Sequence, residues 1–145
     1  MNKKKIPKSV LVVVHDKYLN VLLLERADHK NFWQSITGSL NNSEKKYDAA
    51  LRELQEETGL TNEGTMISTG VYRTFTIDQR WKHKYDNNTK ENIEYEFYYE
   101  LERPLTIKLN SKEHSNFEWV NIEDAIQMVW SWTNKESLKK LAMNP

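Results

Sequence analysis

The sequence predicts an α/β fold in which a mixed β-sheet lies between layers of helices. Short β-branched and aliphatic runs alternate along the chain with segments whose apolar residues recur at helical spacing. A sheet and an amphipathic helix each have an apolar face to bury, so a sheet covered by helices on both sides satisfies the layer rules. The chain has 145 residues and no Pro-, Gly- or Ser-rich linker, which suits a single domain over residues 1–145.

The first two elements are predicted to be buried strands. Residues 9–14 and residues 21–25 are almost entirely aliphatic or β-branched, as expected of strands that are covered on both faces. Residues 16–20, which separate the two runs, are typical of a hairpin or a short connection.

A helix is predicted to follow, with Ser43 as its N-cap and Glu44 as its first residue. Apolar residues then recur at i, i+3, i+4 and i+7 from Tyr47 to Leu54, which gives this helix one face to bury. Gly59 stands where the C-terminus of such a helix is expected.

The second half of the chain is predicted to contain further strands and two C-terminal helices. The strands have aliphatic or alternating character and cover residues 70–77, 94–102 and 117–120. A polar loop at residues 85–91 lies between the first two of them. The helices are predicted over residues 122–129 and 135–143, with Asn121 and Thr133 as N-caps, each followed three residues later by an acid.

The central helix carries an acidic pattern that indicates chemistry. Glu53, Glu56 and Glu57 lie at i, i+3 and i+4, so their carboxylates share one side and repel one another by roughly a few tenths of a kcal/mol per pair. A cation would offset this repulsion. Oxygen-only ligands favour a hard ion such as Mg2+, which keeps coordination positions for water and phosphate oxygens. The pattern predicts a Mg2+ site for a phosphorylated substrate, with Mn2+ as the alternative ion.

The competing interpretation is a solvated acidic helix face, which many glutamate-rich helices present. However, the stretch GSLNNSEKKYDAALRELQEETGL matches the longer pattern Gly-x5-Glu-x7-Arg-Glu-aliphatic-x-Glu-Glu-x-Gly-aliphatic at every defined position. Those positions are Gly38, Glu44, Arg52, Glu53, Leu54, Glu56, Glu57, Gly59 and Leu60. Arg52 is expected to hold the acids in place rather than to touch the substrate.

This pattern is the Nudix box, and the chain therefore resembles the Nudix hydrolase family. The resemblance implies a Nudix-type α/β/α sandwich, and the order of the strands is expected from the resemblance alone. Many relatives carry a second glycine in the turn of the box where this chain has Ser43. Because serine tolerates turns, we expect only a small change in loop shape there.

Other segments resemble one bacterial branch of the family, which hydrolyses dihydroneopterin triphosphate to the monophosphate and pyrophosphate in folate biosynthesis. The similarity spans most of the chain and is carried jointly by residues 31–37, 72–74, 83–85, 112–114, 117–119 and 130–134. It implies the same metal-dependent reaction here, without a covalent intermediate.

The resemblance also implies roles for individual acids. Glu53 and Glu57 would bind the metal, and Glu113 would reach the same cluster from a distant loop. The metal would orient the attacking water and lower its pKa, while Glu56 or Glu113 accepts the proton. Without the resemblance, Glu113 is an ordinary acid of a polar loop.

Substrate contacts are implied in the same way for Lys5, Arg26, Thr37 and Ser131. Each of these residues could equally serve ordinary surface or loop chemistry. The register of Lys5 within a run of three lysines is the least fixed of the four.

Tryptophans and histidines are further candidates for binding roles. Trp33, Trp130 and Trp132 could stack on a flat bicyclic ring, but aromatic residues more often belong to a core, so we expect at most one of them to do so. The four histidines show no close metal-binding spacing, and no serine or cysteine nucleophile motif lies beside them. The sequence therefore argues against a zinc enzyme or a catalytic triad.

Composition sets the outer limits of function. Lys plus Arg and Asp plus Glu number 21 each, so no overall field favours nucleic acid or an anionic membrane as a partner. Cysteine is absent, in agreement with a reducing compartment, and the apolar run at residues 10–14 is too short for a signal peptide or a membrane span. We expect a cytoplasmic protein that acts on a small-molecule triphosphate, and the oligomeric state stays open.

Two alternatives remain at the level of sequence. The chain could prefer a nucleoside triphosphate such as dATP, because a purine and a pterin present similar flat, hydrogen-bonding faces. It could also be a non-catalytic Nudix-like module that binds a nucleotide or a pterin, although such a module has no evident need for the complete set of box acids.

Overall fold

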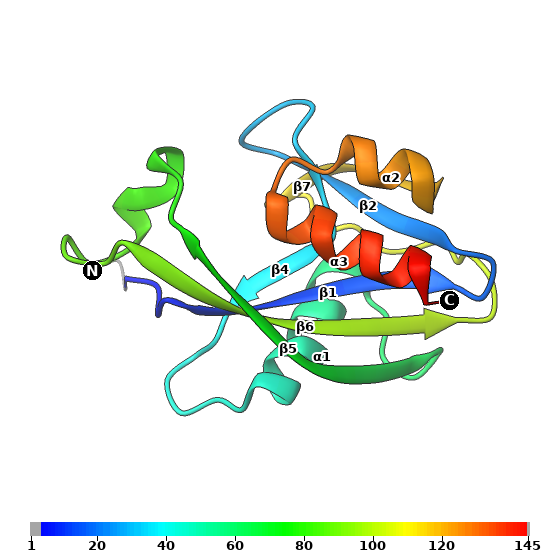
Figure 1. Cartoon of the computed structure of the whole chain (residues 1–145), viewed down its shortest axis with the longest axis horizontal. Coiled ribbons are helices and arrows are strands. Elements are labelled where there is room, and N and C mark those ends of the chain that lie inside the picture. Colours follow the sequence, from blue (N-terminus) through cyan, green and yellow to red (C-terminus); the bar gives the residue numbers. More distant parts are fainter. Residues whose placement is uncertain (1–3, 145) are drawn as a thin grey trace.

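The structure, a computed structural model, describes residues 4–144 and shows a β-sheet with helices on both faces (Figure 1). In chain order the elements are β1 (Lys8–Asp16), β2 (Asn20–Arg26), β3 (Trp33–Gln34), β4 (Ile36–Ser39), α1 (Lys46–Thr58), β5 (Thr65–Thr76), the 3-10 helix η1 (Gln79–Lys84), β6 (Glu91–Leu101), β7 (His114–Asn121), α2 (Ile122–Met128) and α3 (Trp132–Met143). Over residues 4–144, no helix combines the length and the apolar character needed to cross a membrane.

The sheet is mixed, as the sequence predicts. β1 pairs in parallel with β6 and antiparallel with β2 and β4. β5 extends the sheet antiparallel to β6, and β7 pairs antiparallel with β2. Because β1 has neighbours on both edges and helices over both faces, it is buried along almost its whole length. This explains why its sequence is a continuous aliphatic run rather than an alternating one.

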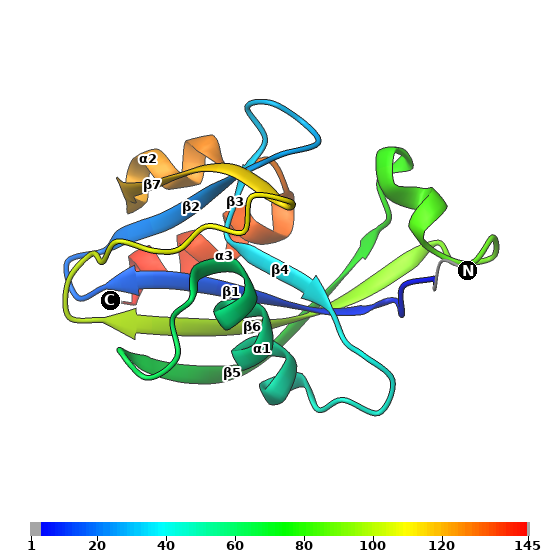
Figure 2. The same cartoon turned by 180° about the vertical axis from the view of Figure 1, so that it is seen from behind.

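The helices divide between the two faces of the sheet. α1 covers one face, and α2 and α3 cover the other, as the opposite views in Figures 1 and 2 show. Successive residues of β1 point to opposite faces: Val12 packs in the core cluster that contains Leu54 of α1, whereas Leu11 and Val13 pack in the cluster that contains Leu138 of α3. The predicted α/β/α arrangement is confirmed.

Two short strands and η1 are not predicted by the sequence pattern. β3 and β4 are too short to show a period, and β4 forms because it pairs with β1 from Ser9–Ser39 to Val12–Ile36. The strand predicted from residue 70 begins earlier, at Thr65. Gly70 takes a left-handed conformation (φ 80°) where the β5–β6 register shifts, so this glycine marks a bulge within a longer strand and not its start.

The predicted start of α1 is wrong. Ser43 does not cap the helix, because it adopts a left-handed conformation (φ 63°), and α1 begins only at Lys46 without any side-chain cap. The side chain of Glu44 turns to Arg52 instead. The buried face also differs slightly, since Tyr47 stays 43% exposed and Ala49 is buried in its place.

The helix boundaries near the C-terminus are correct in one case and wrong in the other. Asn121 caps α2 as predicted, and its side chain accepts a hydrogen bond from the Asp124 amide at 3.0 Å. α3 begins at Trp132 and not at residue 135, because Ser131, rather than Thr133, accepts from the amide of Asn134 at 3.2 Å. Thr133 is buried inside the first turn of this helix.

Candidate active site

The acids of the box form a close group on α1. One carboxylate oxygen from each of Glu53, Glu56 and Glu57 lies within 4.8 Å of the others. Glu53 and Glu57 are buried, whereas Glu56 is exposed. Glu113 lines the same pocket from the loop before β7, and a hydrogen bond of 2.9 Å from the Ala27 amide to the Glu113 carbonyl ties that loop to the end of β2. Among the described residues, Glu113 is not part of the close carboxylate group.

The first glycine of the box makes room for one of these acids. A Cβ atom at Gly38 would lie 2.0 Å from Cδ of Glu53, which no side chain could tolerate without displacing the carboxylate. β4 and α1 can therefore approach each other here only because residue 38 is glycine.

Arg52 holds the acids in place, as the sequence predicts. Its Nε and Nη2 atoms each donate to the Glu44 carboxylate at 2.9 Å, and Nη2 also donates to the Ser39 carbonyl at 2.9 Å. Its Nη1 atom donates to Glu53 at 2.8 Å and to Glu56 at 3.3 Å. One guanidinium thus ties α1 to the end of β4 and to the turn that precedes the helix.

The acidic group is electrostatically suited to a divalent metal. Burial raises the pKa of Glu53 to about 7, the charges of Glu56 and Glu57 add to the rise, and Arg52 only partly opposes it. A cation among these oxygens would favour their ionised forms, and a donor set made only of carboxylates suits a hard ion. The residues present therefore fit such an ion.

A buried histidine contacts one of these acids, and no role for it was predicted from the sequence. His114 Nδ1 lies 2.9 Å from Glu57 Oε1, with both side chains buried. Its Nε2 lies 3.5 Å from Gln34 Nε2. Gln34 Oε1 in turn accepts hydrogen bonds from Trp130 Nε1 at 2.9 Å and from Arg26 at 3.3 Å. Residues 34 and 114 are far apart in the sequence, and only the pairing of β2 with β3 and β7 brings them together.

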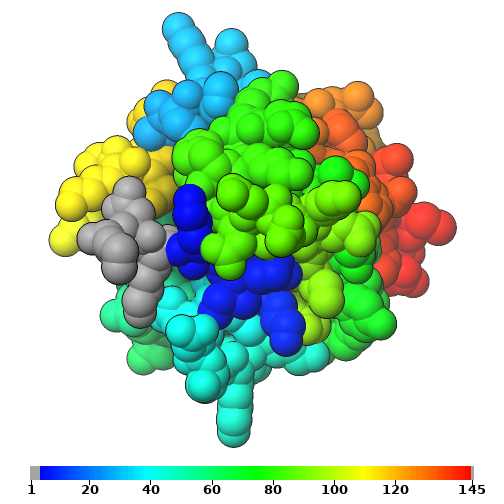
Figure 3. All heavy atoms as spheres, turned by 90° about the vertical axis from the view of Figure 1, so that its left-hand side faces the viewer, coloured from blue at the N-terminus to red at the C-terminus, as the bar shows by residue number. Residues whose placement is uncertain are grey.

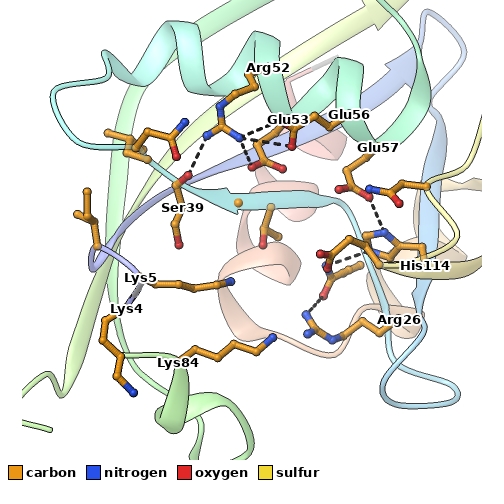
Figure 4. A pocket seen from close by; sticks show the side chains of 18 of the residues that line it. Lys4, Lys5, Arg26, Ser39, Arg52, Glu53, Glu56, Glu57, Lys84 and His114 are labelled. Carbon is orange, nitrogen blue, oxygen red and sulfur yellow. Dashed lines mark hydrogen bonds and ion pairs between the residues drawn. The ribbon is translucent and has the colours of Figure 1, made fainter. Parts of the chain in front are cut away.

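Cationic side chains of Lys5, Arg26 and Lys84 face the acids across the pocket (Figure 4). Lys4 also lines the pocket, but its ammonium donates to the His83 carbonyl at 3.0 Å. Burial lowers the pKa of Lys5, and the neighbouring positive charge of Lys84 adds to this. The structure therefore brings the predicted Lys5, Arg26 and Thr37 into the pocket of the acids, together with Lys84, for which no site role was predicted.

A second, aromatic pocket of about 510 Å³ adjoins the charged one. The two share a wall made of Lys5, Arg26, Gln34, Thr37 and Lys84. Figure 3 looks onto the end of the molecule where the start of β1, the η1 segment and the loop before α1 meet. A volume of this size is within the range of small-molecule sites.

Aromatic rings from distant segments line this second pocket. Trp130 lies 5.0 Å from Trp81 and 5.6 Å from Phe32, measured between ring centroids, and Trp132 is 53% exposed beside them. Trp33, the third predicted candidate, does not line it. Ser131 lines the aromatic pocket and not the charged one, and its hydroxyl caps α3.

Together the two pockets place a region lined by acids and cations beside a region lined by several aromatic rings. A family model described as NUDIX domain matches residues 5–141, and the charged pocket is lined by the box residues Gly38, Arg52, Glu53, Glu56 and Glu57. The chain belongs to the NUDIX domain family. NUDIX hydrolases generally use a divalent metal, and the carboxylate group on α1 supplies suitable ligands for one.

Two bacterial relatives of known name align with nearly the whole chain. A Haemophilus influenzae protein named dihydroneopterin triphosphate diphosphatase is 35% identical, over 99% of this chain and 92% of the relative. The Escherichia coli K12 protein of the same name is 31% identical, over 97% of this chain and 95% of the relative. The solved structure of the E. coli dihydroneopterin triphosphate pyrophosphohydrolase superposes with a TM-score of 0.92 at 30% identity, over 98% of this chain and 99% of that one.

Proposed function

We propose that this chain hydrolyses dihydroneopterin triphosphate to dihydroneopterin monophosphate and pyrophosphate in a Mg2+-dependent reaction of folate biosynthesis. As a NUDIX hydrolase, it is an enzyme that acts on phosphoric anhydrides. The observation that carries the choice of substrate is the shared wall: a pocket of acids and cations opens directly into an aromatic pocket. A ring joined to a triphosphate would span the two, and the full-length similarity to the named relatives points the same way.

Glu53, Glu57 and Glu113 are assigned to the metal. A divalent ion held there would neutralise phosphate oxygens and lower the pKa of the attacking water. Mn2+ is the alternative to Mg2+, since both accept carboxylate oxygens. His114 would keep Glu57 oriented through the contact at Nδ1, in the way that residues behind a metal site commonly fix its ligands.

The proton from the attacking water would go to Glu56 or to Glu113. Glu56 is exposed at the pocket and joined to Arg52 only through contacts of 3.3 and 3.4 Å, so it can pass a proton on to solvent. Lys5, Arg26 and Lys84 would contact the phosphates from the opposite side, with Thr37 between them. Ser131 would contact the substrate from the aromatic side.

The test is pyrophosphate release from dihydroneopterin triphosphate, dATP and the other nucleoside triphosphates, with Mg2+ and with chelator. Wild type is compared with Glu57→Gln and, as a matched control, with Glu100→Gln, the same change at an exposed position of β6. Glu57→Gln should lower turnover by at least about 100-fold, because loss of a residue that merely supports a metal ligand already costs about 10- to 100-fold.

The outcomes separate the candidate functions. Preference for the pterin, lost with chelator and in Glu57→Gln but kept in Glu100→Gln, supports the proposal. Preference for dATP would keep the mechanism and transfer the function to nucleotide metabolism. Metal-independent binding without any pyrophosphate release would instead identify a non-catalytic binding module, and near-normal turnover by Glu57→Gln would contradict the metal site.

A further inference from the structure

The wall of the aromatic pocket contains a buried acid that the hydrolytic chemistry does not use. Glu94 lies on β6, is only 6% exposed, and lines the pocket together with aromatic residues and the first turn of α3. Glu94 is not among the described residues that line the charged pocket with the box acids. The box pattern gives no reason for an acid here.

The carboxylate of Glu94 lacks the partners that its neighbour on the same strand has. Arg73 stands directly across from Glu94 on β5, but its guanidinium donates to Glu96 at 2.8 Å. Lys140 of α3 is paired with Glu96 as well. Within residues 4–144, Oε1 of Glu94 is buried and has no hydrogen-bond partner.

A buried acid without an ion pair is unfavourable for folding. Burial raises the pKa of Glu94 to about 7, the charge of Glu96 adds to the rise, and Thr133 and Arg73 only partly oppose it. Buried polar atoms are normally satisfied, so an exception at the wall of a ligand pocket calls for an explanation. A ligand that donates hydrogen bonds from within the pocket would supply the missing partners.

The other acid that lines this pocket is already occupied. Both oxygens of Asp78 are engaged by Arg80, one by its amide at 2.9 Å and the other by its guanidinium at 2.6 Å. Among the described residues that line the aromatic pocket, Glu94 is thus the acid with an oxygen left for a ligand.

We propose that Glu94 reads the edge of the substrate ring, accepting hydrogen bonds from a ring N–H and from the amino group beside it. This paired-donor edge belongs to 2-amino-4-oxo-pyrimidine rings, which pterins and guanine share. A carboxylate only accepts hydrogen bonds and can take two donors side by side. The corresponding edge of adenine places a ring nitrogen lone pair beside its amino group, so one acceptor would face another.

The layout of the pocket supports this orientation. The cations of the shared wall hold the phosphates at one side, and the rings of Trp81 and Trp130 offer apolar surface for the flat faces of a ring. The edge of that ring is then left to Glu94. The inference rests on the proposed function, because it names what selects the ring at the same site.

The test compares dGTP with dITP, which differ only in the 2-amino group, and adds dATP and dihydroneopterin triphosphate. Each is measured as a substrate or as a competitor of dihydroneopterin triphosphate hydrolysis, for wild type, Glu94→Gln and the control Glu100→Gln. Wild type should favour dGTP over dITP by about 10- to 100-fold in kcat/KM or in inhibition constant, the range for one good bidentate contact to a base. Glu94→Gln should reduce this ratio to within about threefold and improve dATP relative to dGTP, because an amide offers one donor and one acceptor.

Several results would overturn the inference. These are a wild type that does not distinguish dGTP from dITP, a Glu94→Gln variant that keeps the wild-type ratio, or a variant in which all substrates weaken by the same factor, as loss of structure alone would give. The wild-type ratio needs no variant, so the test holds even if Glu94→Gln folds poorly. Absence of pyrophosphate release from every compound would instead refute the proposed function. Release from the pterin with an unchanged ratio would refute only the role of Glu94.

Discussion

Replacing Glu94 by glutamine should stabilise the protein at pH 8 and change its stability much less at pH 5. The pKa of this carboxyl is raised from 4.5 to about 7 in the folded state. Between these two values the folded protein binds more protons than the unfolded chain, so stability falls as the pH rises through this window and is constant above it. Glutamine does not titrate, and the fall should therefore disappear in the variant.

The size of the effect follows from the shift. A rise of the pKa from 4.5 to about 7, at 1.36 kcal/mol per pKa unit, corresponds to about 3 kcal/mol in the fully ionised state. Because part of the loss has already occurred at pH 5, the advantage of the variant should grow by about 2.5 kcal/mol between pH 5 and pH 8. Glu94 is almost fully buried, so solvent screening reduces this figure little.

Urea unfolding at pH 5, 6, 7 and 8 would measure this difference for wild type, Glu94→Gln and Glu100→Gln. The buffers should contain chelator, because a bound metal would stabilise the folded state through the box acids. Glu53 has a similarly raised pKa, but it is present in all three proteins and cancels in the comparison. A stability difference that does not change with pH would refute the reasoning, since it would mean that Glu94 titrates normally and has a partner.

Two further predictions concern the charged pocket. Gly38→Ala places a Cβ atom 2.0 Å from the Glu53 carboxylate. It should raise the Mg2+ concentration for half-maximal turnover by at least about tenfold, on the scale of losing one metal-ligand support; an unchanged metal titration would contradict this. Arg52→Lys cannot reproduce the paired donation to Glu44 and the bond to Ser39. We expect the free energy of unfolding in urea to fall by about 1 to 2 kcal/mol, because hydrogen bonds to charged groups are lost at a site whose partial exposure limits the cost. A loss near zero would show that any cation at this position stabilises the acids equally well.

Structural features that depend only on residues close together in the sequence could be predicted. The aliphatic runs of β1 and β2 and the spacing of the acids on α1 are local patterns, and the structure confirms both. The capping of α2 by Asn121 is local too. A local pattern can also fail: Ser43 has the chemistry of an N-cap, but its left-handed conformation and the engagement of Glu44 by Arg52 move the helix start.

Features that depend on the pairing of distant segments could not be predicted from local sequence patterns. β4 has no period of its own and exists because β1 offers it an edge. The contact between His114 and Glu57 joins β7 to α1. Lys84 lines the charged pocket because the end of η1 lies beside the segment before β1, where the Lys5 amide donates to the Lys84 carbonyl at 2.7 Å. Neither spacing nor composition marks these residues as members of the site.

The charged pocket and the aromatic pocket also differ in how local their residues are in the sequence, and this difference bears on substrate specificity. Of the acids that would hold the metal, Glu53 and Glu57 come from α1, and Arg52 ties Glu53 to Glu44 and Glu56, so a change in this segment disturbs several acids at once. The ring pocket draws residues from several strands, the loop before β3, η1 and the start of α3, and Glu94 is not among the described residues that line the charged pocket. A substitution at Glu94 can therefore alter which ring is accepted while the phosphate chemistry stays intact. With this separation, the same box could act on a pterin or on a purine triphosphate. The ratio of kcat/KM for two substrates that differ in the ring therefore reports on the aromatic pocket, whereas the rate with one substrate reports on both pockets.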